Sequence, residues 1–432
     1  MLRKLWFYYS HLYLIFQFRD CDTKTLYAQK AEKFGNLPLL AEGHLRRITV
    51  LADTACAGAF ESFRENALPL FNLAGLQVDI IKPINISEFK TIAKHIDSTE
   101  CDALYIVGGD STLSAVLSAF HYRENNLPLS IGVFPGGIEN RSLVGLVPSV
   151  FGFQNDIHSQ CESAMALIEE KIRPVYLSRV KLVSIFNFCN QMENSESKNE
   201  SIYGVTGLHI GWFDRVETNK AKLWYCGPLK RWIAYLTAAI RTLKQYPEVR
   251  INMTCEEYCA GCCRCRSQPE TVEVVQNRRW WQNIIGSTNY SSLNLMKPII
   301  DYSQIKNENC GKTREVVVNA VDIALENVQN QNACSLRVRT GNVEYSRIGL
   351  LMDGWRRCQA KQLSASPDID FYQNDLLVRS ATITFSAMLP DAVKKMTVFG
   401  NECQINDLKT RIFVESTNNF VNMYLPSEVR VL

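Results

Sequence analysis

The run from Gly108 to Thr112, Gly-Gly-Asp-Ser-Thr, has residue types that suit phosphate chemistry, and it follows the short apolar segment 103–107. That segment is typical of a buried parallel strand, and the two glycines, which lack a Cβ, let the backbone turn sharply and approach a ligand closely. Asp110 would lie at the carboxyl end of the strand, where open α/β sheets bind ligands. Ser111 or Thr112 could cap the following helix, whose N-terminus attracts phosphate. The run therefore predicts a nucleotide site, with an ordinary strand-to-helix turn as the alternative.

A second glycine turn, Pro135-Gly136-Gly137, follows the apolar strand candidate 129–134. Because the carboxyl ends of parallel strands meet at one edge of a sheet, we expect the two glycine turns to lie side by side. Two adjacent turns would offer backbone N–H groups to a phosphate. The pair therefore strengthens the prediction of a nucleotide site at this edge.

Alternating strands and helices make up the first half of the chain. Apolar runs predict four strands, at residues 48–51, 78–81, 103–107 and 129–134. Amphipathic or capped segments predict helices between them, at residues 59–73, 87–95 and 113–120. This order is typical of a parallel sheet with right-handed crossovers. Residues 44–172 are therefore expected to form an α/β nucleotide-binding lobe.

The second half of the chain, residues 173–432, changes character and is expected to form a β-rich lobe. Its strand candidates are rich in β-branched and aromatic residues and lie at 175–184, 203–210, 249–255, 316–323, 335–338, 381–388 and 411–414. One helix is predicted at 232–243, and the turn-rich residues from about 256 to 315 indicate a loop insertion. We therefore predict a parallel α/β lobe followed by a mainly antiparallel β lobe, with a cleft between them.

Length, composition and charge limit the kinds of protein that this sequence can encode. The chain has 432 residues, 46% of them hydrophobic and 21% charged, which fits a globular protein of two domains. A formal net charge of +3 is too weak to indicate nucleic-acid binding. Fifteen cysteines without a secretory signal favour reduced thiols over a disulfide framework.

The first 19 residues contain Arg3, Lys4 and Arg19 but no acidic residue. Between these cations, residues 5–18 are almost entirely aromatic or aliphatic, yet they fall short of the roughly 20 residues that span a bilayer as a helix. This composition predicts a targeting or anchor segment within residues 1–43. A first helix packed on the body of the protein is the alternative.

A cysteine cluster, Cys255, Cys259, Cys262, Cys263 and Cys265, falls at the start of the insertion. Zn²⁺ takes four thiolate or imidazole ligands in a tetrahedron. The cluster therefore predicts a structural zinc site on Cys255, Cys259, Cys262 and Cys265, with Cys263 as the spare thiol. A disulfide and free thiols are the alternatives.

Two parts of the chain resemble a known family. The run Gly108-Gly109-Asp110-Ser111-Thr112-Leu113 is similar to the Gly-Gly-Asp-Gly-Thr-Leu signature of the diacylglycerol kinase and sphingosine kinase superfamily. The segments 204–213 and 222–230 resemble the mitochondrial acylglycerol kinases within it. The resemblance runs, with gaps, from about residue 34 to the C-terminus.

The resemblance implies a Rossmann-like α/β lobe, an antiparallel β-sandwich lobe, and phosphorylation of a lipid hydroxyl by ATP and Mg²⁺ in the cleft. The acceptor would be a monoacylglycerol, a diacylglycerol or ceramide, and Asp110 would be the catalytic residue. The nucleotide would be bound by residues of three motifs, namely Gly108, Gly109, Ser111, Thr112, Pro135, Gly136, Gly137, Asp353 and Gly354. The resemblance also implies a place at the mitochondrial inner membrane or in the intermembrane space. A second, non-enzymatic role as a subunit of the inner-membrane carrier translocase is implied as well.

Four departures from the family pattern fall where nucleotide or substrate would be contacted. Asp53 stands where the family has the proline of an Asn-Pro pair, and its charge would repel phosphates. Ser111 replaces a glycine, Tyr176 an aspartate and Trp355 a glutamate. Because phosphoryl transfer depends on neutralising charge around the phosphates, these changes predict either a weakened kinase or a catalytically inactive scaffold in mitochondrial protein import.

Overall fold

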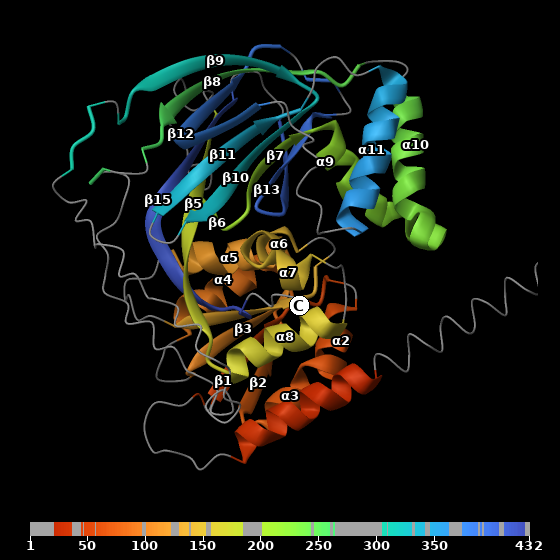
Figure 1. Cartoon of the computed structure of the whole chain (residues 1–432), viewed down its shortest axis with the longest axis vertical. Helices are drawn as coiled ribbons and strands as arrows, with labels where there is room; N and C mark the ends of the chain where they lie inside the picture. Colours follow the sequence, from red (N-terminus) through yellow and green to blue (C-terminus); the bar gives the residue numbers. More distant parts are fainter. Residues whose placement is uncertain are drawn as a thin grey trace, which may run out of the picture.

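The computed structural model of the chain shows two lobes arranged along its longest axis (Figure 1). The lower lobe in that view contains the first four strands, and the upper lobe contains the antiparallel strands of the second half. The residues that the structure describes are 21–36, 45, 47–56, 58–96, 101–121, 129–137, 140–152, 157–184, 201–242, 246–259, 262–263, 305–308, 310–330, 333–341, 346–362, 374–387, 389–390, 393–405 and 410–427.

Four parallel strands form the sheet of the first lobe, in the order β2-β1-β3-β4. They are β1 (Arg47–Ala52), β2 (Gln77–Ile81), β3 (Ala103–Gly108) and β4 (Ser130–Pro135). Along β3 the side chains alternate between two buried cores: Leu104 lies in one, and its neighbour Tyr105 lies in the other. Burial on both faces explains why such a strand is a continuous apolar run, and all four predicted strands are present.

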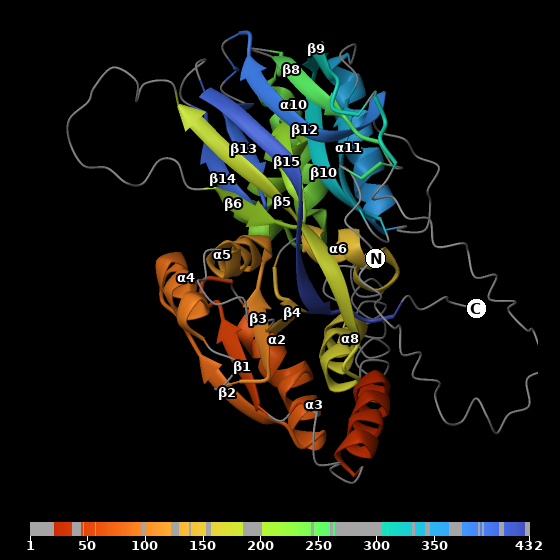
Figure 2. The same ribbon diagram turned by 90° about the vertical axis from the view of Figure 1, so that its left-hand side faces the viewer.

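Helices cover both faces of this sheet (Figure 2). One face carries α4 (Ile86–His95), α5 (Asp110–His121), α6 (Arg141–Leu146) and α7 (Pro148–Phe151). The other carries α2 (Ala59–Asn66), α3 (Leu68–Leu73), α8 (Ile157–Ile168) and a helix over residues 21–35. The single helix predicted at 59–73 is therefore wrong. Proline lacks the N–H that a helix interior needs. The chain therefore begins a second helix here, with Pro69 in the first turn of α3.

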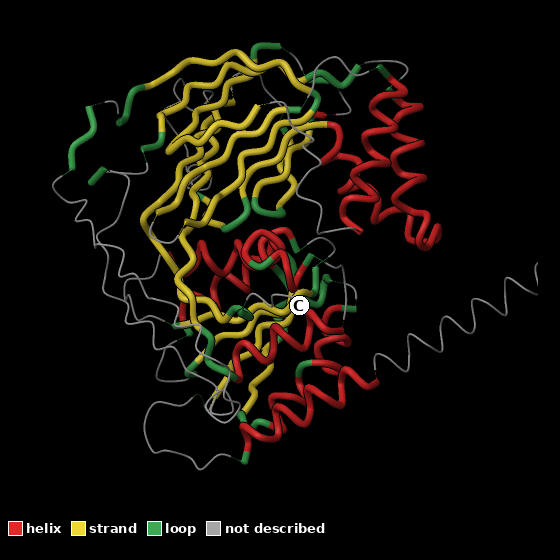
Figure 3. The backbone as a smooth tube through the Cα atoms, viewed as in Figure 1, coloured by secondary structure: helices red, strands yellow, loops and turns green. Residues whose placement is uncertain are grey.

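Strands make up most of the second lobe (Figure 3). Among the residues described, every strand pairing within this lobe is antiparallel. The strands are β5 (Ile172–Ser184), β6 (Ile202–Gly204), β7 (Gly207–Gly211), β8 (Val249–Glu257), β9 (Thr313–Ala320), β10 (Asp322–Asn330), β11 (Ala333–Thr340), β12 (Asn374–Phe385), β13 (Lys395–Val398), β14 (Asn401–Gln404) and β15 (Thr410–Tyr424). Together with the first sheet they confirm the predicted α/β lobe followed by an antiparallel β lobe. The strand predicted at 203–210 is two strands, and β13 and β14 were not predicted.

Two long strands, β5 and β15, run through both lobes (Figure 2). β15 pairs with β12 in the second lobe, and its last residues, Met423 and Tyr424, pair in parallel with β4 in the first. Backbone hydrogen bonding is therefore continuous from one lobe to the other. The predicted boundary near residue 173 falls at the start of β5, but the end of β15 returns to the first lobe.

A group of helices lies against one side of the second lobe (Figure 1). It consists of α9 (Trp212–Asn219), the 3₁₀ segment η2 (Lys220–Leu229), α10 (Lys230–Arg241) and α11 (Arg347–Gln362). Of these, only α10 was predicted. α11 contains Gly349 and Gly354, which lower helix propensity by about 1 kcal/mol each relative to alanine and obscure the pattern.

No helix in the described part of the chain is long and apolar enough to cross a membrane. The predicted targeting segment, residues 1–19, lies outside the described residues, as do residues 264–304 of the insertion.

Phe63 is the centre of the aromatic packing beneath β3. It is fully buried, and its ring lies 5.9 Å from that of Tyr105, 6.2 Å from that of Phe71 and 5.7 Å from that of Phe134. We expect Phe63→Ala to lower the free energy of unfolding in urea by about 3–5 kcal/mol, because it leaves a cavity. Ile84→Ala, at a side chain that is 80% exposed, is the control and should change it by less than about 0.5 kcal/mol. Equal effects of the two substitutions would contradict this packing.

Candidate functional site

The two glycine turns touch each other at the carboxyl edge of the parallel sheet. β3 and β4 pair in register up to Gly108 and Pro135. A Cβ built on Gly137 would lie 2.8 Å from the Cα of Gly109, and one on Gly136 would lie 3.4 Å from the backbone nitrogen of Gly108. The structure thus brings together the two turns as the sequence predicts. Their missing Cβ atoms permit this close packing, so a side chain at either turn would push the two apart.

Asp110 is the first residue of α5, and its carboxylate holds the start of α6. Oδ2 accepts the backbone N–H of Arg141 at 2.8 Å, and Oδ1 accepts that of Ser142 at 2.9 Å. These donors belong to the first turn of α6, where N–H groups have no partner within the helix. Because α5 begins at Asp110, Ser111 and Thr112 lie inside its first turn, and the expectation that one of them caps the helix is wrong.

The end of β1 carries a buried carboxylate beside these turns. Asp53 Oδ2 accepts the Thr112 hydroxyl at 2.5 Å and the Cys56 thiol at 3.6 Å, while Oδ1 accepts the N–H of Ala55 at 2.9 Å. Burial, followed by the charge of Asp53, raises the pKa of Cys56 to about 11. A carboxylate and a neutral thiol therefore occupy the place where the family resemblance implies a nucleotide contact.

The turn between β13 and β14 lies over the first turn of α5. A Cβ built on Gly400 would come within 2.7 Å of the Cβ of Asp110 and 2.8 Å of the backbone nitrogen of Ser111. Gly400 also has a φ of +82°, which L side chains rarely adopt. Glycine is thus required here for both conformation and space. In this conformation the second lobe covers the helix N-terminus where the sequence predicts a phosphate.

An ion pair links this edge to the second lobe. Arg141 Nη1 lies 2.7 Å from Oδ1 of Asp214 on α9, and the Asp214 side chain is only 6% exposed. Thr397 on β13 donates its hydroxyl to the other carboxylate oxygen of Asp214 at 2.6 Å. This pair therefore links α6 of the first lobe to α9 and β13 of the second.

Asp353 and Gly354, which are predicted to bind the nucleotide, lie on α11 in the second lobe. Asp353 pairs with Arg357 at 3.3 Å, and Arg357 also pairs with Asp322 at 3.1 Å. Gly354 packs under the ring of Tyr235, which a Cβ would approach to 2.3 Å. Burial raises the pKa of Asp322, and the Arg357 charge opposes that rise. These two residues therefore belong to a structural cluster centred on Arg357.

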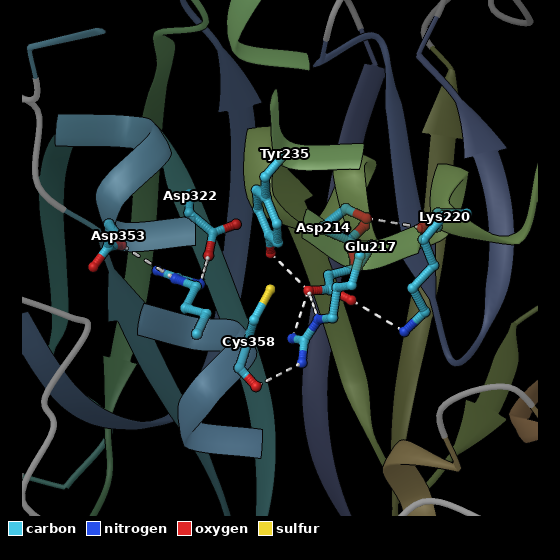
Figure 4. Close-up of polar contacts among 10 residues, drawn as sticks. Asp214, Glu217, Lys220, Tyr235, Asp322, Asp353 and Cys358 are labelled. Atoms are coloured by element: carbon cyan, nitrogen blue, oxygen red, sulfur yellow. Dashed lines mark hydrogen bonds and ion pairs between the residues drawn. The ribbon is translucent and has the colours of Figure 1, made fainter. Parts of the chain in front are cut away.

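A second buried cluster, centred on Glu217, was not predicted from the sequence (Figure 4). Oε1 of Glu217 accepts the Tyr235 hydroxyl and Nη2 of Arg231, both at 2.6 Å, and Oε2 pairs with Nζ of Lys220 at 3.0 Å. Burial and the Glu217 charge raise the pKa of Tyr235 well above its ordinary value. The members come from the three consecutive elements α9, η2 and α10. The cluster joins these three elements to one another.

The cysteines predicted to bind zinc do not all lie together in the structure. Cys255 lies on β8 in the hydrophobic core of the second lobe, and burial raises the pKa of its thiol to about 11, which disfavours the thiolate that zinc needs. Cys262 Sγ lies 3.3 Å from Cys310 Sγ, and Cys259 accepts a hydrogen bond from Asn307. Cys265 is outside the described residues. Among the residues described, no group of three or more His, Cys, Asp or Glu side chains is arranged to hold a metal ion.

A polar cavity of about 530 Å³ lies at the other end of α5, between the lobes. Its walls include Arg179 and Glu415, which pair at 2.6 Å, and His121, whose ring stacks on Tyr203 with 3.9 Å between the ring centroids. Charged walls do not suit an acyl chain, because burying charge against hydrocarbon is costly. The cavity is therefore not where we place a lipid tail.

The burial of His209 on β7 predicts that the stability of the protein depends on pH. Burial, followed by the nearby charge of Arg141, lowers its pKa from the ordinary 6.5. Below that pH the unfolded chain binds a proton that the folded chain resists, so the free energy of unfolding should fall as the pH falls from 6.5 toward 5. We expect His209→Gln to flatten this dependence in urea titrations at several pH values. The exposed His95→Gln is the control, and a wild-type slope in both variants would contradict the assignment.

Comparison with known proteins identifies the family. Residues 47–180 match the family model of the diacylglycerol kinase catalytic domain. An uncharacterized protein of Caenorhabditis elegans is 32% identical over 420 residues, covering 96% of this chain and 90% of that protein. The mitochondrial acylglycerol kinase of Homo sapiens is 26% identical over 263 residues, covering 59% of this chain and 57% of that protein.

The mitochondrial acylglycerol kinase of Xenopus laevis is 24% identical over 241 residues, 54% of this chain and 52% of that protein, so the match spans about half the length of these kinases. A crystal structure of a diacylglycerol kinase from Bacillus anthracis str. Sterne aligns with 89% of this chain and 99% of its own, at 12% identity and a TM-score of 0.45. The chain is a divergent member of the diacylglycerol kinase and sphingosine kinase superfamily.

Proposed function

We propose that this protein is an acylglycerol kinase-like lipid kinase that transfers a phosphoryl group from ATP to the hydroxyl of a monoacylglycerol, a diacylglycerol or ceramide. The observation that carries the proposal is the convergence of Asp110, the α5 N-terminus and both glycine turns at one sheet edge that faces the second lobe. This edge is the ligand-binding edge of open α/β folds. Family membership gives the reaction class.

The backbone N–H groups at this edge suit a nucleotide's phosphates, but the charges of its side chains suit them only in part. The first turn of α5 and the glycine turns offer N–H groups of the kind that bind phosphate. The carboxylates of Asp53, Asp110 and Asp214 give the edge negative charge, and Arg141 is already paired. Mg²⁺ bound with ATP would supply the missing positive charge. The turn at Gly400 would have to withdraw from α5 to admit the phosphates.

Asp110 would orient the lipid hydroxyl and accept its proton. Its two oxygens are held by the N–H groups of Arg141 and Ser142, which fixes the direction of the carboxylate. Each carboxylate oxygen has a further lone pair for the substrate. The lost charge contacts lead us to expect slow turnover.

The proposed location is the mitochondrial inner membrane or the intermembrane space. It is supported by the names of the acylglycerol kinase relatives and by the acid-free, basic and aromatic residues 1–19. A zinc ion on the cysteine cluster remains a proposal that would need Cys265 and a shift of Cys255.

The alternative function is that of a catalytically inactive scaffold in mitochondrial inner-membrane protein import, together with subunits of the carrier translocase. Two observations favour it: the carboxylate of Asp53 at the end of β1, and the turn at Gly400 that covers the α5 N-terminus. A scaffold needs the fold and its surfaces but no nucleotide.

Substitution of Asp110 tests the kinase proposal. We expect Asp110→Asn to lower kcat for phosphorylation of diacylglycerol in mixed micelles by about 100-fold or more, with a much smaller change in the KM for ATP. Asp79→Asn, at an exposed position on β2, is the matched control and should retain wild-type turnover. A melting curve of each variant separates catalysis from loss of the α6 contact. Wild-type protein that neither binds ATP nor phosphorylates lipid would favour the scaffold.

Asp53→Asn tests whether phosphates approach the end of β1. The amide oxygen can still accept the Thr112 hydroxyl, while the hydrogen bond from the Ala55 N–H is lost together with the charge. A melting curve of the variant checks that the loss of this bond leaves it folded. If phosphates bind within several ångströms, relief of repulsion should tighten Mg²⁺-ATP binding by roughly tenfold in isothermal titration. Asp79→Asn should leave the affinity unchanged. An unchanged affinity in both variants would place the nucleotide elsewhere.

A further inference from the structure

Exposed apolar side chains gather on the helical group of the second lobe. On η2 and α10 they are Tyr225, Leu229, Leu236 and Ile240, which are 44–68% exposed. Leu229, Leu236 and Ile240 are spaced by seven and four residues, which places them on one face of α10 and its leading turn. The neighbouring α11 adds Ile348 and Met352, one turn apart.

The exposed charges of the same helices are all positive among the residues described. They are Lys222, Lys230, Arg241 and Arg356. No acidic residue occurs anywhere between residues 220 and 241. We define these ten side chains, six apolar and four basic, as the helical face.

The carboxylates of α9 and α11 are turned inward and paired. Asp214 pairs with Arg141, Glu217 with Lys220 and Arg231, and Asp353 with Arg357. Each of these acids is less than 10% exposed. Burial of all three therefore leaves the outward side of the helical group basic.

The side of α10 opposite the helical face is packed against its neighbours. The opposite side of α10 packs Ala234 and Tyr235 into a hydrophobic core, and the Trp232 ring lies 5.4 Å from that of Trp355 on α11. The Glu217 cluster ties α10 to α9 and η2 (Figure 4). The exposed apolar side chains therefore belong to a helix that is already fully packed on its inner side.

We propose that the helical face docks this protein onto an anionic lipid surface. Apolar and aromatic side chains interleaved with lysine and arginine are typical of helices that lie in the membrane interface, and basic residues are attracted to anionic head groups. The described residues of η2, α10 and α11 present no exposed acidic side chain, which favours an anionic partner. Docking requires no phosphoryl transfer, so it holds whether or not the chain turns over ATP.

Vesicle flotation with the full chain tests the docking. Vesicles of phosphatidylcholine alone would be compared with vesicles that also contain about 30% phosphatidylglycerol, an anionic lipid. We expect wild-type protein to bind the anionic vesicles at least tenfold more tightly. Lys230→Gln with Arg241→Gln should weaken that binding about thirtyfold, and Leu236→Ser with Ile240→Ser should weaken it at least tenfold.

Matched controls lie elsewhere on the surface. Val317→Ser removes a 73% exposed side chain from β9, and Arg64→Gln removes an exposed cation from α2. Both should bind as the wild type does. Residues 1–19 are the same in every variant, so any contribution from them cancels in the comparison.

Hydrogen exchange locates the contact independently of the substitutions. Anionic vesicles should slow amide exchange within residues 220–241 but not within β9. The proposal is overturned if the helical-face variants bind as tightly as Val317→Ser. It is also overturned if exchange slows only elsewhere, or if Leu236→Ser with Ile240→Ser abolishes self-association in sedimentation and leaves vesicle binding unchanged.

Discussion

The contact of the Asp110 carboxylate with the start of α6 organises the region between the lobes. By accepting the N–H groups of Arg141 and Ser142, Asp110 fixes α6, and α6 in turn presents the Arg141 side chain to Asp214. Asp214 is held from the other side by Thr397. One chain of polar contacts therefore runs from the end of a parallel strand, through a helix N-terminus, into the antiparallel lobe. The backbone of β15 pairs with β12 in the second lobe and with β4 in the first, so it links the two lobes at a second place.

Buried charge explains both the interior and the surface of the helical group. Glu217 and Asp353 are withdrawn from solvent together with partner cations, because a buried carboxylate without a partner would be strongly destabilising. The lysines and arginines left over, such as Lys230 and Arg241, stay outside among exposed apolar side chains. The pairing that stabilises the inside of the group thereby determines the charge of its outer face. A protein of a lipid-kinase family would thus combine a reaction edge between its lobes with a separate surface for its membrane.

The sequence predicted the features that depend on local pattern. The buried strands β3 and β4 are apolar runs, and the two glycine turns follow from the rule that parallel strands end at one edge. Features assembled from distant segments were not predictable. Asp214, the partner of Arg141, lies 73 residues further along the chain, and the β13–β14 turn reaches α5 from almost 300 residues away along the chain. Spacing alone also says nothing of burial: Cys255 fits a ligand spacing, and the structure places it in the core of the second lobe. In the same way Asp353 fits a family motif, yet it pairs with Arg357.

A crystal structure of the protein with a non-hydrolysable ATP analogue and Mg²⁺ would test the central claim most directly, since that claim concerns where phosphates bind. We expect the triphosphate to lie against the backbone of Gly109 to Thr112 and of the Gly136–Gly137 turn, with the β13–β14 turn at Gly400 moved away from α5. An analogue bound at the polar cavity near His121, or a structure at millimolar analogue in which Gly400 still covers the α5 N-terminus and no nucleotide is bound, would contradict the claim.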